Sequence, residues 1–431
     1  PNGIDIGTYS GTNGTVRENE ISGCSWKDFT GDYETSWSGS GILVIESGDS
    51  LELSGNIVYD CDVGMDIESD SMNITCNEVY DNIYGSVFWN AKPKVDYNNI
   101  YSNTQYGAYR TTSGDLTGVL DARFNWWGNA NGPTHSSNPD GTGDTISDNV
   151  DYSPWLGATF ATIPRTYHVN PSGAPGAIQE AIDEASSGDT VMVHEGTYNE
   201  ALYINKDISI FGASLPIIQG SGSFTTNYGT REAVIFVENA VVTLWHLDIE
   251  GQGLGPGKNY GVIYEESIGT IRGCIVSPNT IGDMVGNAIG IWDGSDVNVR
   301  ECTVRNFGRI GVFFYDGCSG GVHSCTIEGQ VYSDQNYVNY GIEIEPWNEP
   351  CNVEILENDI YNCDNTHPSP SWSSAGIVID GWVAFYDLPS STVVMSCNDI
   401  YNNYYGIEVV ANPYSYAHYN NIYSNREYGV I

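Results

Sequence analysis

Short runs of alternating apolar and polar residues, separated by Asn and Gly, recur along this chain of 431 residues. Residues 56–61, 77–82 and 98–103 read NIVYDC, NEVYDN and NNIYSN, so these blocks begin 21 residues apart. Each block is followed by a Gly and a short apolar segment, as in GMDI at residues 64–67. The alternation, with its β-branched and aromatic residues, predicts short strands separated by tight turns.

The same unit returns far along the chain. Residues 358–363, 398–403 and 420–425 read NDIYNC, NDIYNN and NNIYSN, and the last two blocks begin 22 residues apart. This period is too short for a helical hairpin repeat and fits one coil of a parallel β-helix. A single coil cannot bury its own apolar face, so the coils are expected to stack into an all-β solenoid.

The Asn-rich unit resembles the repeat of the right-handed parallel β-helix superfamily, which includes pectate lyases and many archaeal surface proteins. The resemblance covers most of the chain. It implies a right-handed parallel β-helix, but it implies no particular activity. In type, the chain is most similar to archaeal surface-layer and sheath-like proteins of this fold.

A Trp-rich segment interrupts the repeats at residues 120–156, which contain FNWWGNANGPTH. It resembles the segment that closes β-helix domains in archaeal surface-layer-like proteins. Trp126, Trp127 and Trp155 are therefore expected to cover the apolar end of a first stack of coils. Residues 159–166 then read as a linker.

A helix is expected after this linker, because apolar residues recur there at helical spacing: Ala177, Ile178, Ala181, Ile182 and Ala185. The segment resembles the N-terminal capping helix of pectin-methylesterase-like β-helices. We therefore predict two tandem β-helix domains. Residues 1–158 form the first, with the Trp-rich closing segment, and residues 167–431 form the second, which starts with a short capping helix.

The two ends of the chain bear on whether the protein associates with itself. The sequence begins at Pro1 rather than Met, the first repeat begins in mid-coil, and the last repeat stops in mid-coil. Open strand edges are templates for pairing with another chain. Self-association into a polymer or lattice is expected from this, and simple truncation of a longer chain is the alternative.

The charge narrows the set of partners. Lys and Arg number 15 against 55 Asp and Glu, so the formal net charge is -40. This balance argues against nucleic acids and anionic membrane surfaces. No segment approaches the roughly twenty apolar residues that a membrane span requires. The excess of acidic residues could instead serve to bind divalent cations or cationic polymers, or simply keep the protein in solution.

Acidic residues follow the predicted strands at positions that should point outward. Glu343, Glu345 and Asp380 are candidate calcium ligands, since Ca²⁺ prefers carboxylate oxygens. The alternatives are a solvated acidic face and an acid–base pair for glycoside hydrolysis. An enzyme would need a cleft in which two or three acids of one set converge within reach of a sugar: Asp293, Asp316, Glu343, Glu345 and Asp380. Apart from calcium, no cofactor is indicated.

The resemblance to pectate lyases assigns no catalytic residue. Those enzymes combine calcium-binding acids with a basic residue, but Arg300, Arg305 and Arg309 lie in no lyase motif. The flanking motif of pectin methylesterases is also missing. We therefore name no catalytic residue, and an enzyme is the less favoured reading.

Aromatic residues lie on or beside the predicted strands: Trp89, Tyr109, Trp292, Tyr315 and Trp347. Exposed rings of this kind stack on sugars, so a carbohydrate-binding groove is one interpretation. Rings that cover backbone or form a subunit interface are the other.

Two further patterns concern modification. The cysteines share repeat positions, as at Cys274, Cys302 and Cys325, and are expected to be buried free thiols, although disulfides between adjacent coils are conceivable. Asn13 and Asn73 begin glycosylation sequons. Together the patterns favour a structural extracellular protein of the cell surface: a surface-layer, sheath or fibre subunit. A carbohydrate-binding or adhesion module and a polysaccharide lyase or hydrolase are the alternatives.

Overall fold

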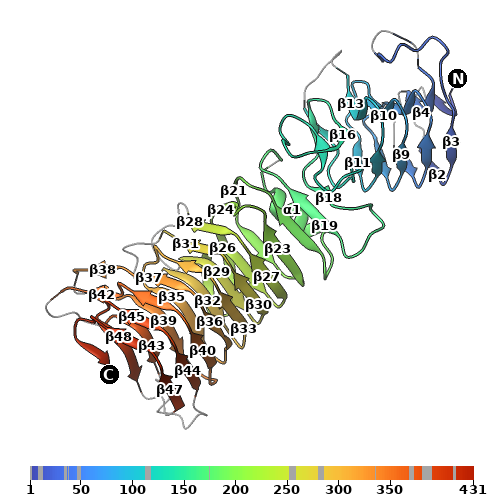
Figure 1. Ribbon diagram of the computed structural model, residues 1–431. Coiled ribbons are helices and arrows are strands. Elements are labelled where there is room, and N and C mark those ends of the chain that lie inside the picture. Colours follow the sequence, from blue (N-terminus) through green and yellow to red (C-terminus); the bar gives the residue numbers. More distant parts are fainter. Residues whose placement is uncertain are drawn as a thin grey trace. The chain divides into compact units, whose positions relative to one another are not determined.

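A computed structural model shows coils of short strands along the chain (Figure 1). It describes residues 2–7, 13–33, 36, 38–45, 50–111, 118–173, 175–251, 259–279, 286–334, 336–367, 373–380, 391–410 and 414–431. The chain divides into two compact units. The first comprises Pro1–Ala181 and Asp189–Met192, and the second comprises Ile182–Gly188 and Val193–Ile431.

Three parallel sheets form the first unit, and the chain passes from one sheet to the next within each coil. The first sheet has the order β1 (Ile4–Gly7), β4 (Ser40–Ile45), β7 (Val63–Glu68), β10 (Tyr84–Phe88) and β13 (Tyr106–Arg110). The second has the order β11 (Lys94–Asp96), β8 (Met72–Thr75), β5 (Leu51–Ser54) and β2 (Gly14–Arg17). The third has the order β12 (Asn99–Tyr101), β9 (Glu78–Tyr80), β6 (Ile57–Tyr59) and β3 (Glu20–Ser22).

The Trp-rich segment follows these coils. It contains the pairs β14 (Leu120–Asp121) with β17 (Val150–Asp151) and β15 (Pro133–Thr134) with β16 (Gly143–Thr145), and it ends in β18 (Trp155–Leu156). β19 (Thr166–Val169) and β20 (Thr190–Val193) come after it in the chain. Trp127 and Trp155 are fully buried, as expected of a closing segment, and both belong to the core cluster of the first unit. Trp126 is half-buried and packs on Tyr101, with ring centroids 5.4 Å apart.

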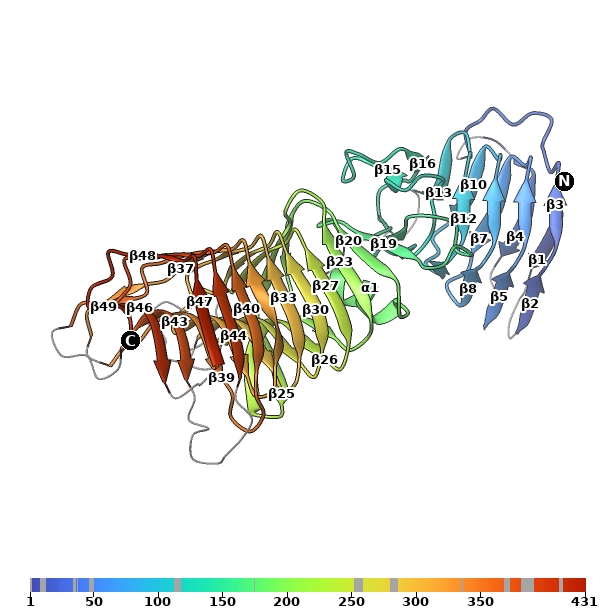
Figure 2. The ribbon, with the colours of Figure 1, turned by 60° about the horizontal axis from the view of Figure 1, so that its bottom comes forward.

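The second unit repeats the three-sheet plan with longer sheets (Figure 2). One sheet runs β23 (Ile208–Gly212), β27 (Val241–Trp245), β30 (Ile268–Arg272), β33 (Asp296–Arg300), β36 (Ser319–His323), β40 (Asn352–Leu356), β44 (Thr392–Ser396) and β47 (Tyr414–His418). Another runs β21 (Thr197–Asn199), β24 (Ile217–Gly220), β28 (Asp248–Gly251), β31 (Ile275–Ser277), β34 (Thr303–Val304), β37 (Thr326–Glu328), β41 (Asp359–Tyr361), β45 (Asp399–Tyr401) and β48 (Asn421–Tyr423).

The third sheet of the second unit has a hairpin beside it. It runs β22 (Leu202–Ile204), β26 (Gly229–Glu238), β29 (Asn259–Glu265), β32 (Asn287–Trp292), β35 (Ile310–Tyr315), β39 (Tyr340–Glu345), β43 (Ala375–Asp380), β46 (Tyr405–Val410) and β49 (Tyr428–Val430). An antiparallel hairpin joins β25 (Gly222–Thr226) to β26 at one side. A short outer pair joins β38 (Val331–Tyr332) to β42 (Asp364–Asn365).

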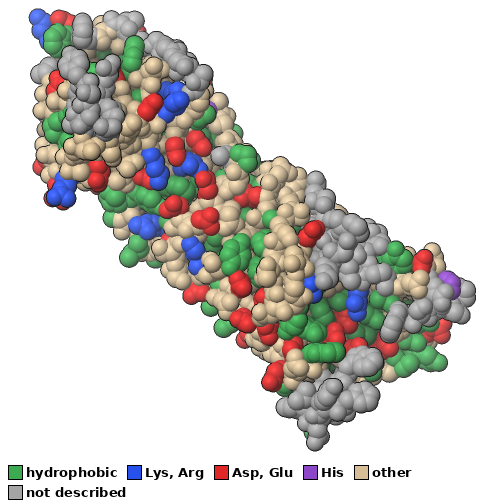
Figure 3. All heavy atoms as spheres, turned by 180° about the vertical axis from the view of Figure 1, so that it is seen from behind, with side chains coloured by type: hydrophobic (Ala, Val, Ile, Leu, Met, Phe, Trp, Pro, Cys, Tyr) green, Lys and Arg blue, Asp and Glu red, His purple; other side chains and the backbone are tan. Residues whose placement is uncertain are grey.

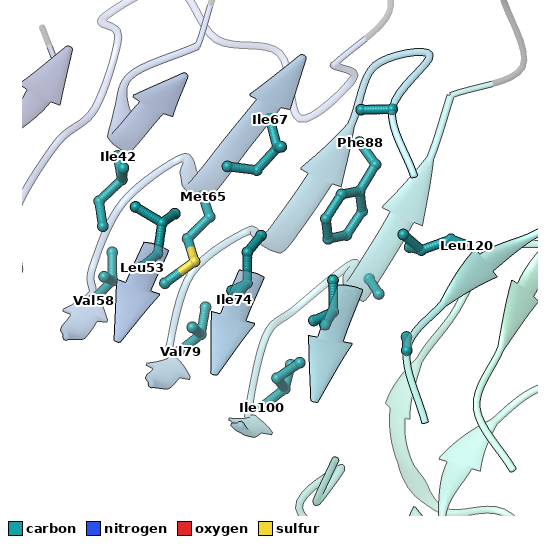
Figure 4. Packing of buried hydrophobic residues seen from close by; sticks show 14 of the residues in the cluster. Ile42, Leu53, Val58, Met65, Ile67, Ile74, Val79, Phe88, Ile100 and Leu120 are labelled. Carbon is teal, nitrogen blue, oxygen red and sulfur yellow. The ribbon is translucent and has the colours of Figure 1, made fainter. Parts of the chain in front are cut away.

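The interior of the coils explains the apolar half of the repeat. Figure 4 shows Ile42, Met65 and Phe88 from one sheet pointing toward Leu53 and its equivalents from the others. These side chains are almost wholly excluded from solvent. Since alternate residues of a strand point to the same side, the period-two pattern places the apolar residues of each strand in the core.

The Asn of the repeat forms a buried ladder. The side-chain oxygen of Asn77 accepts hydrogen bonds from the backbone and side chain of Asn56, at 2.9 and 3.0 Å. Asn77 in turn donates to Asn98 at 2.9 Å and to the carbonyl of Leu53 at 2.9 Å. Asn358, Asn398 and Asn420 repeat this arrangement in the second unit. The ladder satisfies backbone groups at the turn, which is why Asn recurs there.

The repeat Gly has a steric role. A Cβ atom on Gly64 would lie 2.5 Å from the carbonyl oxygen of Gly85, and one on Gly85 would lie 2.6 Å from that of Gly107. No real Cβ makes such a contact with backbone, so the stacking of neighbouring coils requires Gly at this position.

The predicted capping helix is confirmed as α1 (Ala177–Glu184), the one helix among the described residues. Its apolar residues are buried, and Gly188 follows with a positive φ of 93°. No described helix is long and apolar enough to cross a membrane. All ten cysteines are free, and eight of them, including the predicted Cys274, Cys302 and Cys325, are buried. Cys76 and Cys397 are exposed.

Candidate functional site

A row of unlike side chains marks the outward face of the third sheet of the second unit. Glu265, Trp292, Tyr315 and Glu345 occupy one register position on the successive strands β29, β32, β35 and β39. Stacked strands lie about 4.8 Å apart, so consecutive side chains in this row can touch. Two acids thus flank two aromatic rings.

The hairpin β25–β26 lies across this row. Tyr228 at its tip makes edge-to-face contacts with Trp292 at 5.9 Å and with Tyr315 at 5.0 Å between ring centroids. The backbone N–H of Asn227 donates to the Glu265 carboxylate at 3.0 Å, and the Tyr228 hydroxyl donates to Asp316 at 3.4 Å. The hairpin tip is therefore anchored to the sheet face.

A pocket of about 300 Å³ opens between the hairpin and the sheet. It is lined by Tyr228, Arg231, Tyr260, Asn287, Trp292, Arg309, Ile310, Phe313, Tyr315 and Glu345. Gly290 lies beneath the Trp292 ring, because a Cβ at that position would come within 3.0 Å of the indole. The guanidinium of Arg231 lies over the same indole at 5.7 Å. The pocket thus combines aromatic faces with cationic and acidic groups.

Several buried polar atoms in and beside the pocket have no hydrogen-bond partner in the described part of the chain. They are Asn287 Oδ1, Trp292 Nε1, Arg309 Nε and Glu343 Oε2. Buried polar atoms are nearly always paired in folded proteins. These four atoms can pair with a polar ligand or with ordered water.

Burial changes the acidity of the carboxyl groups here. Desolvation raises the pKa of Glu343 to about 8 and that of Glu345 to about 7. The Arg309 guanidinium, 3.8 Å from Glu343, opposes this shift, whereas Glu345 and Asp380 add to it by like-charge repulsion. Near neutral pH, Glu343 is therefore largely a neutral carboxylic acid that can donate a hydrogen bond.

Asp316 differs from these two glutamates because donors surround it. The backbone N–H groups of Asn348 and Glu349 donate to its Oδ1 at 2.6 and 2.8 Å, and the Asn348 side chain donates to Oδ2 at 2.8 Å. Its charge also raises the pKa of Glu345. One carboxyl held by hydrogen bonds thus lies next to one, Glu345, that changes its protonation state near neutral pH.

The structure brings the predicted calcium ligands onto neighbouring strands. Glu343 and Glu345 lie on β39, and Asp380 ends β43, the next strand. Within the described residues, no group of three His, Cys, Asp or Glu side chains could hold a metal ion. Calcium binding by these three residues stays a prediction.

The model of the right-handed β-helix region matches residues 1–122, 233–386 and 287–431, which is more than half of the chain. The chain belongs to the right-handed β-helix family. No curated protein matches this member of the family.

Three solved structures are similar to this β-helix protein at low identity. Pectin methylesterase from Erwinia chrysanthemi is 13% identical with a TM-score of 0.37, covering 61% of this chain and 92% of its own. A periplasmic alginate epimerase is 11% identical with a TM-score of 0.38, covering 88% and 76%. The Dettilon tailspike is 12% identical with a TM-score of 0.34, covering 88% and 62%.

The other predicted site residues of this β-helix protein are dispersed. Trp292 and Tyr315 line the pocket, whereas Trp89 and Tyr109 belong to the first unit. Trp347 is exposed. The sequons at Asn13 and Asn73 have exposed side chains, and their glycosylation stays a prediction.

Sequence reasoning missed the residues that turn the row into a pocket: Tyr228, Arg231, Tyr260 and Asn287. The first two belong to a hairpin inserted between coils, and its turn is visible in the sequence as Asn227-Tyr228-Gly229. Such a turn predicts a hairpin. It does not predict which face of a solenoid the hairpin covers.

Proposed function

We propose that the second unit binds a saccharide in the pocket beneath the hairpin. The observation that supports this most is the conjunction of aromatic faces with unpaired polar atoms around one cavity of about 300 Å³. Sugar rings offer apolar C–H faces to aromatic rings and hydroxyl groups that both donate and accept. Pockets that are mainly apolar with a few convergent polar groups are typical of small-ligand sites.

Each unpaired atom has a matching partner on a sugar. Hydroxyl groups can donate to Asn287 Oδ1 and can accept from Trp292 Nε1 and Arg309 Nε. Protonated Glu343 can donate to a ring or glycosidic oxygen. A purely apolar ligand would leave these groups buried and unpaired, at a cost of about 1–3 kcal/mol each.

A direct test is isothermal titration of the whole chain with a panel of neutral and acidic oligosaccharides. Trp292→Ala and Asn287→Ala are expected to weaken binding of the best ligand at least tenfold. Trp347→Ala, an exposed Trp outside the pocket lining, is the matched control and should leave binding unchanged. Equal affinity of all four proteins, or no binding by any member of the panel, would contradict the proposal.

Glycoside hydrolysis is the second candidate, favoured by Glu345. This residue lines the pocket with a pKa of about 7, beside the hydrogen-bonded carboxylate of Asp316. Pairs of carboxyls with unlike environments serve as acid and base in glycosidases. Release of reducing ends that falls above pH 7 and disappears in Glu345→Gln would support it. Activity that survives this substitution would exclude Glu345 as the acid.

A structural role in the cell envelope is a further proposal, with self-association as its mechanism and the cell surface as its location. The Asn ladders and the stacked Tyr59, Tyr80 and Tyr101 rings, 5.1 and 5.0 Å apart, support a stiff solenoid suited to such a role. On the face that Figure 3 shows, acidic side chains are scattered rather than gathered in one patch. Electron microscopy of native material tests this: ordered arrays would support it and dispersed single molecules would contradict it.

A further inference from the structure

One Asn ladder of the second unit contains cysteines where other coils contain Asn. The backbone N–H of Cys325 donates to Asn358 Oδ1 at 2.9 Å, as the backbone N–H of Asn358 does to Asn398 at 3.0 Å. The backbone N–H of Cys302 donates to the sulfur of Cys325 at 3.4 Å. Strand register places a third cysteine, Cys274, in the coil before Cys302. Three successive coils thus carry a buried thiol at the ladder position.

Two further pairs of buried cysteines have the same arrangement. Strands β36 and β40 begin one residue after Cys318 and Cys351, and their first residues are paired, so the two cysteines lie in neighbouring coils. Cys24 and Cys61 each lie two residues beyond the paired strands β3 and β6. The backbone N–H of Cys61 donates to Asn82 Oδ1 at 3.0 Å, so this pair also belongs to a ladder. Seven of the eight buried cysteines therefore have another cysteine in a neighbouring coil.

A thiol contributes less to the ladder than an amide does. Asn77 donates to the carbonyl of Leu53 at 2.9 Å, whereas the sulfur of Cys302 lies 3.5 Å from the equivalent carbonyl of Ile271. Because a thiol is a weak donor and a weak acceptor, each replacement gives up hydrogen-bond energy at a buried turn. A single buried cysteine can be accounted for as a small apolar side chain. A run of them in neighbouring coils indicates another source of stability.

We propose that these cysteines form disulfides between neighbouring coils: Cys24 with Cys61, Cys318 with Cys351, and Cys302 with either Cys274 or Cys325. Neighbouring coils lie about 4.8 Å apart, within the roughly 4.4–6.8 Å between Cα atoms that a disulfide spans. The described chain, with ten free thiols, is then the reduced form. The inference goes beyond the proposed function, since it concerns the interior of the coils rather than a ligand pocket.

The chemistry of the interior favours a disulfide over a metal ion at these pairs. A disulfide carries no charge, so it can be buried without a counter-charge. Two thiolates around a soft ion such as Cu⁺ would leave a net negative charge in the core, which is costly. Disulfides also persist in oxidising compartments, which agrees with the location outside the cell proposed above.

The bonds form by thiol–disulfide exchange with a small disulfide such as oxidised glutathione. One thiolate of the chain attacks the glutathione disulfide and releases one glutathione. The second thiolate then attacks the mixed disulfide and releases the other. Each pair of cysteines loses two protons and two electrons, and these leave in the two glutathione thiols.

Burial determines when this exchange takes place. Desolvation raises the pKa of Cys61 and that of Cys351 to about 12, so both thiols stay protonated in the folded chain near neutral pH. Only the thiolate attacks a disulfide. The bonds are therefore expected to form while the chain folds, and the folded reduced chain should react far more slowly.

The test is refolding of the whole chain from denaturant in a glutathione redox buffer or in a reductant. Free thiols are then blocked in denaturant and counted by mass spectrometry. Three disulfides consume six of the ten thiols, so four should remain after oxidative refolding and ten after reductive refolding. Peptide mapping should recover the three predicted pairs. The oxidised chain should unfold at a temperature at least about 5 °C higher, and reductant in the denaturing buffer should remove this difference.

Two substitutions separate pairing from the mere presence of a buried thiol. Cys351→Ser should remove one disulfide and leave five free thiols after oxidative refolding. Cys363→Ser is the matched control, because Cys363 is buried but its ladder neighbour is Asn403, to which its backbone N–H donates at 2.9 Å. This variant should keep all three disulfides and leave three free thiols.

Several results would overturn the proposal. They are ten free thiols after oxidative refolding, disulfides only at the exposed Cys76 and Cys397, pairings without preference for neighbouring coils, and a metal ion bound at the thiols instead. A second measurement does not depend on refolding. Native material blocked with iodoacetamide during extraction should give the same peptide map, and fully alkylated buried cysteines in that material would contradict it.

Discussion

The two units are built from the same coil, but the outward face of one sheet is covered differently in each. In the first unit, Phe29 and Tyr33 pack against Val63, Tyr84 and Val87. In the second, the β25–β26 hairpin places one tyrosine over a row of rings and leaves a pocket. An excursion of the chain between coils, rather than the coil itself, therefore decides whether a face is closed or open.

One buried acid in each unit, Asp66 and Glu343, also differs in how many hydrogen bonds it accepts. The Tyr33 hydroxyl donates to Asp66 at 2.8 Å, and the Ser40 hydroxyl donates to its other oxygen at 3.2 Å. Glu343 Oε2 has no partner among the described residues. Burial raises both pKa values, that of Asp66 to about 6 and that of Glu343 to about 8. The acid with fewer donors is the one shifted further, as expected if hydrogen bonds stabilise the charged form.

The largest expected effect is the one that Glu343 has on how the free energy of unfolding depends on pH. Its folded pKa is raised, so the unfolded chain loses this proton near pH 4.5 while the folded chain keeps it until about pH 8. Stability should therefore fall as pH rises through this window, at roughly 1.4 kcal/mol per pH unit, and level off above it. Glu265 and Glu345 of the same unit have pKa values raised to about 7 and add to this slope, so Glu343→Gln should reduce the slope and be the more stable protein at pH 9.

Chemical denaturation of the second unit at pH 4, 6, 8 and 9 measures this effect. Glu328→Gln, on the half-buried exterior of β37, is the control for loss of one charge. Parallel pH profiles for the natural protein and Glu343→Gln would show that this carboxyl is not strained by burial.

The next largest effect is expected at the Asn ladder, which both units contain. Asn77 and Asn398 hold equivalent ladder positions, and each accepts two hydrogen bonds from the preceding Asn of its ladder. Asn77→Ala and Asn398→Ala should each cost about 3 kcal/mol, because several buried donors and acceptors lose their partners. Asn19→Ala, at the less buried start of the ladder, should cost less. A large difference between Asn77 and Asn398 in denaturant titrations would mean that the two stacks are not held alike.

The repeats allowed the fold to be predicted, and particular residues show why. Each repeat fixes Asn in the ladder and Gly where coils meet, so local chemistry specifies stacking regardless of the rest of the chain. The cavities were not predictable in this way. Arg110 looks like an ordinary strand residue in the sequence, and only the register with Phe88 shows that it points inward. The outward acids Glu343 and Glu345 were identified, but their raised pKa values depend on side chains from inserted segments.

A smaller effect is expected at Asp66. The unfolded pKa of Asp is near 3.8 and the folded value is about 6, so stability should decline across this interval and not beyond it. Asp144 and Asp151 of this unit also have pKa values raised to about 6, so Asp66→Asn should reduce that decline by its own share, about 3 kcal/mol at most, without abolishing it. The profile of the first unit above pH 6 should be unaffected. An unchanged slope in Asp66→Asn between pH 4 and 6 would assign the titration to other groups.

The smallest effects concern the covering tyrosines themselves. Tyr33→Phe removes a 2.8 Å hydrogen bond to a buried carboxylate and should cost about 1–2 kcal/mol, with a higher pKa at Asp66. Tyr228→Phe removes a 3.4 Å bond to an aspartate that already has three other donated bonds, so its cost should be below about 0.5 kcal/mol. Both variants keep the ring packing, so thermal unfolding isolates the hydroxyl. Equal losses would mean that the hairpin closes its face as tightly as Tyr33 closes the other, and the second-unit pocket would then be a closed surface rather than a binding site.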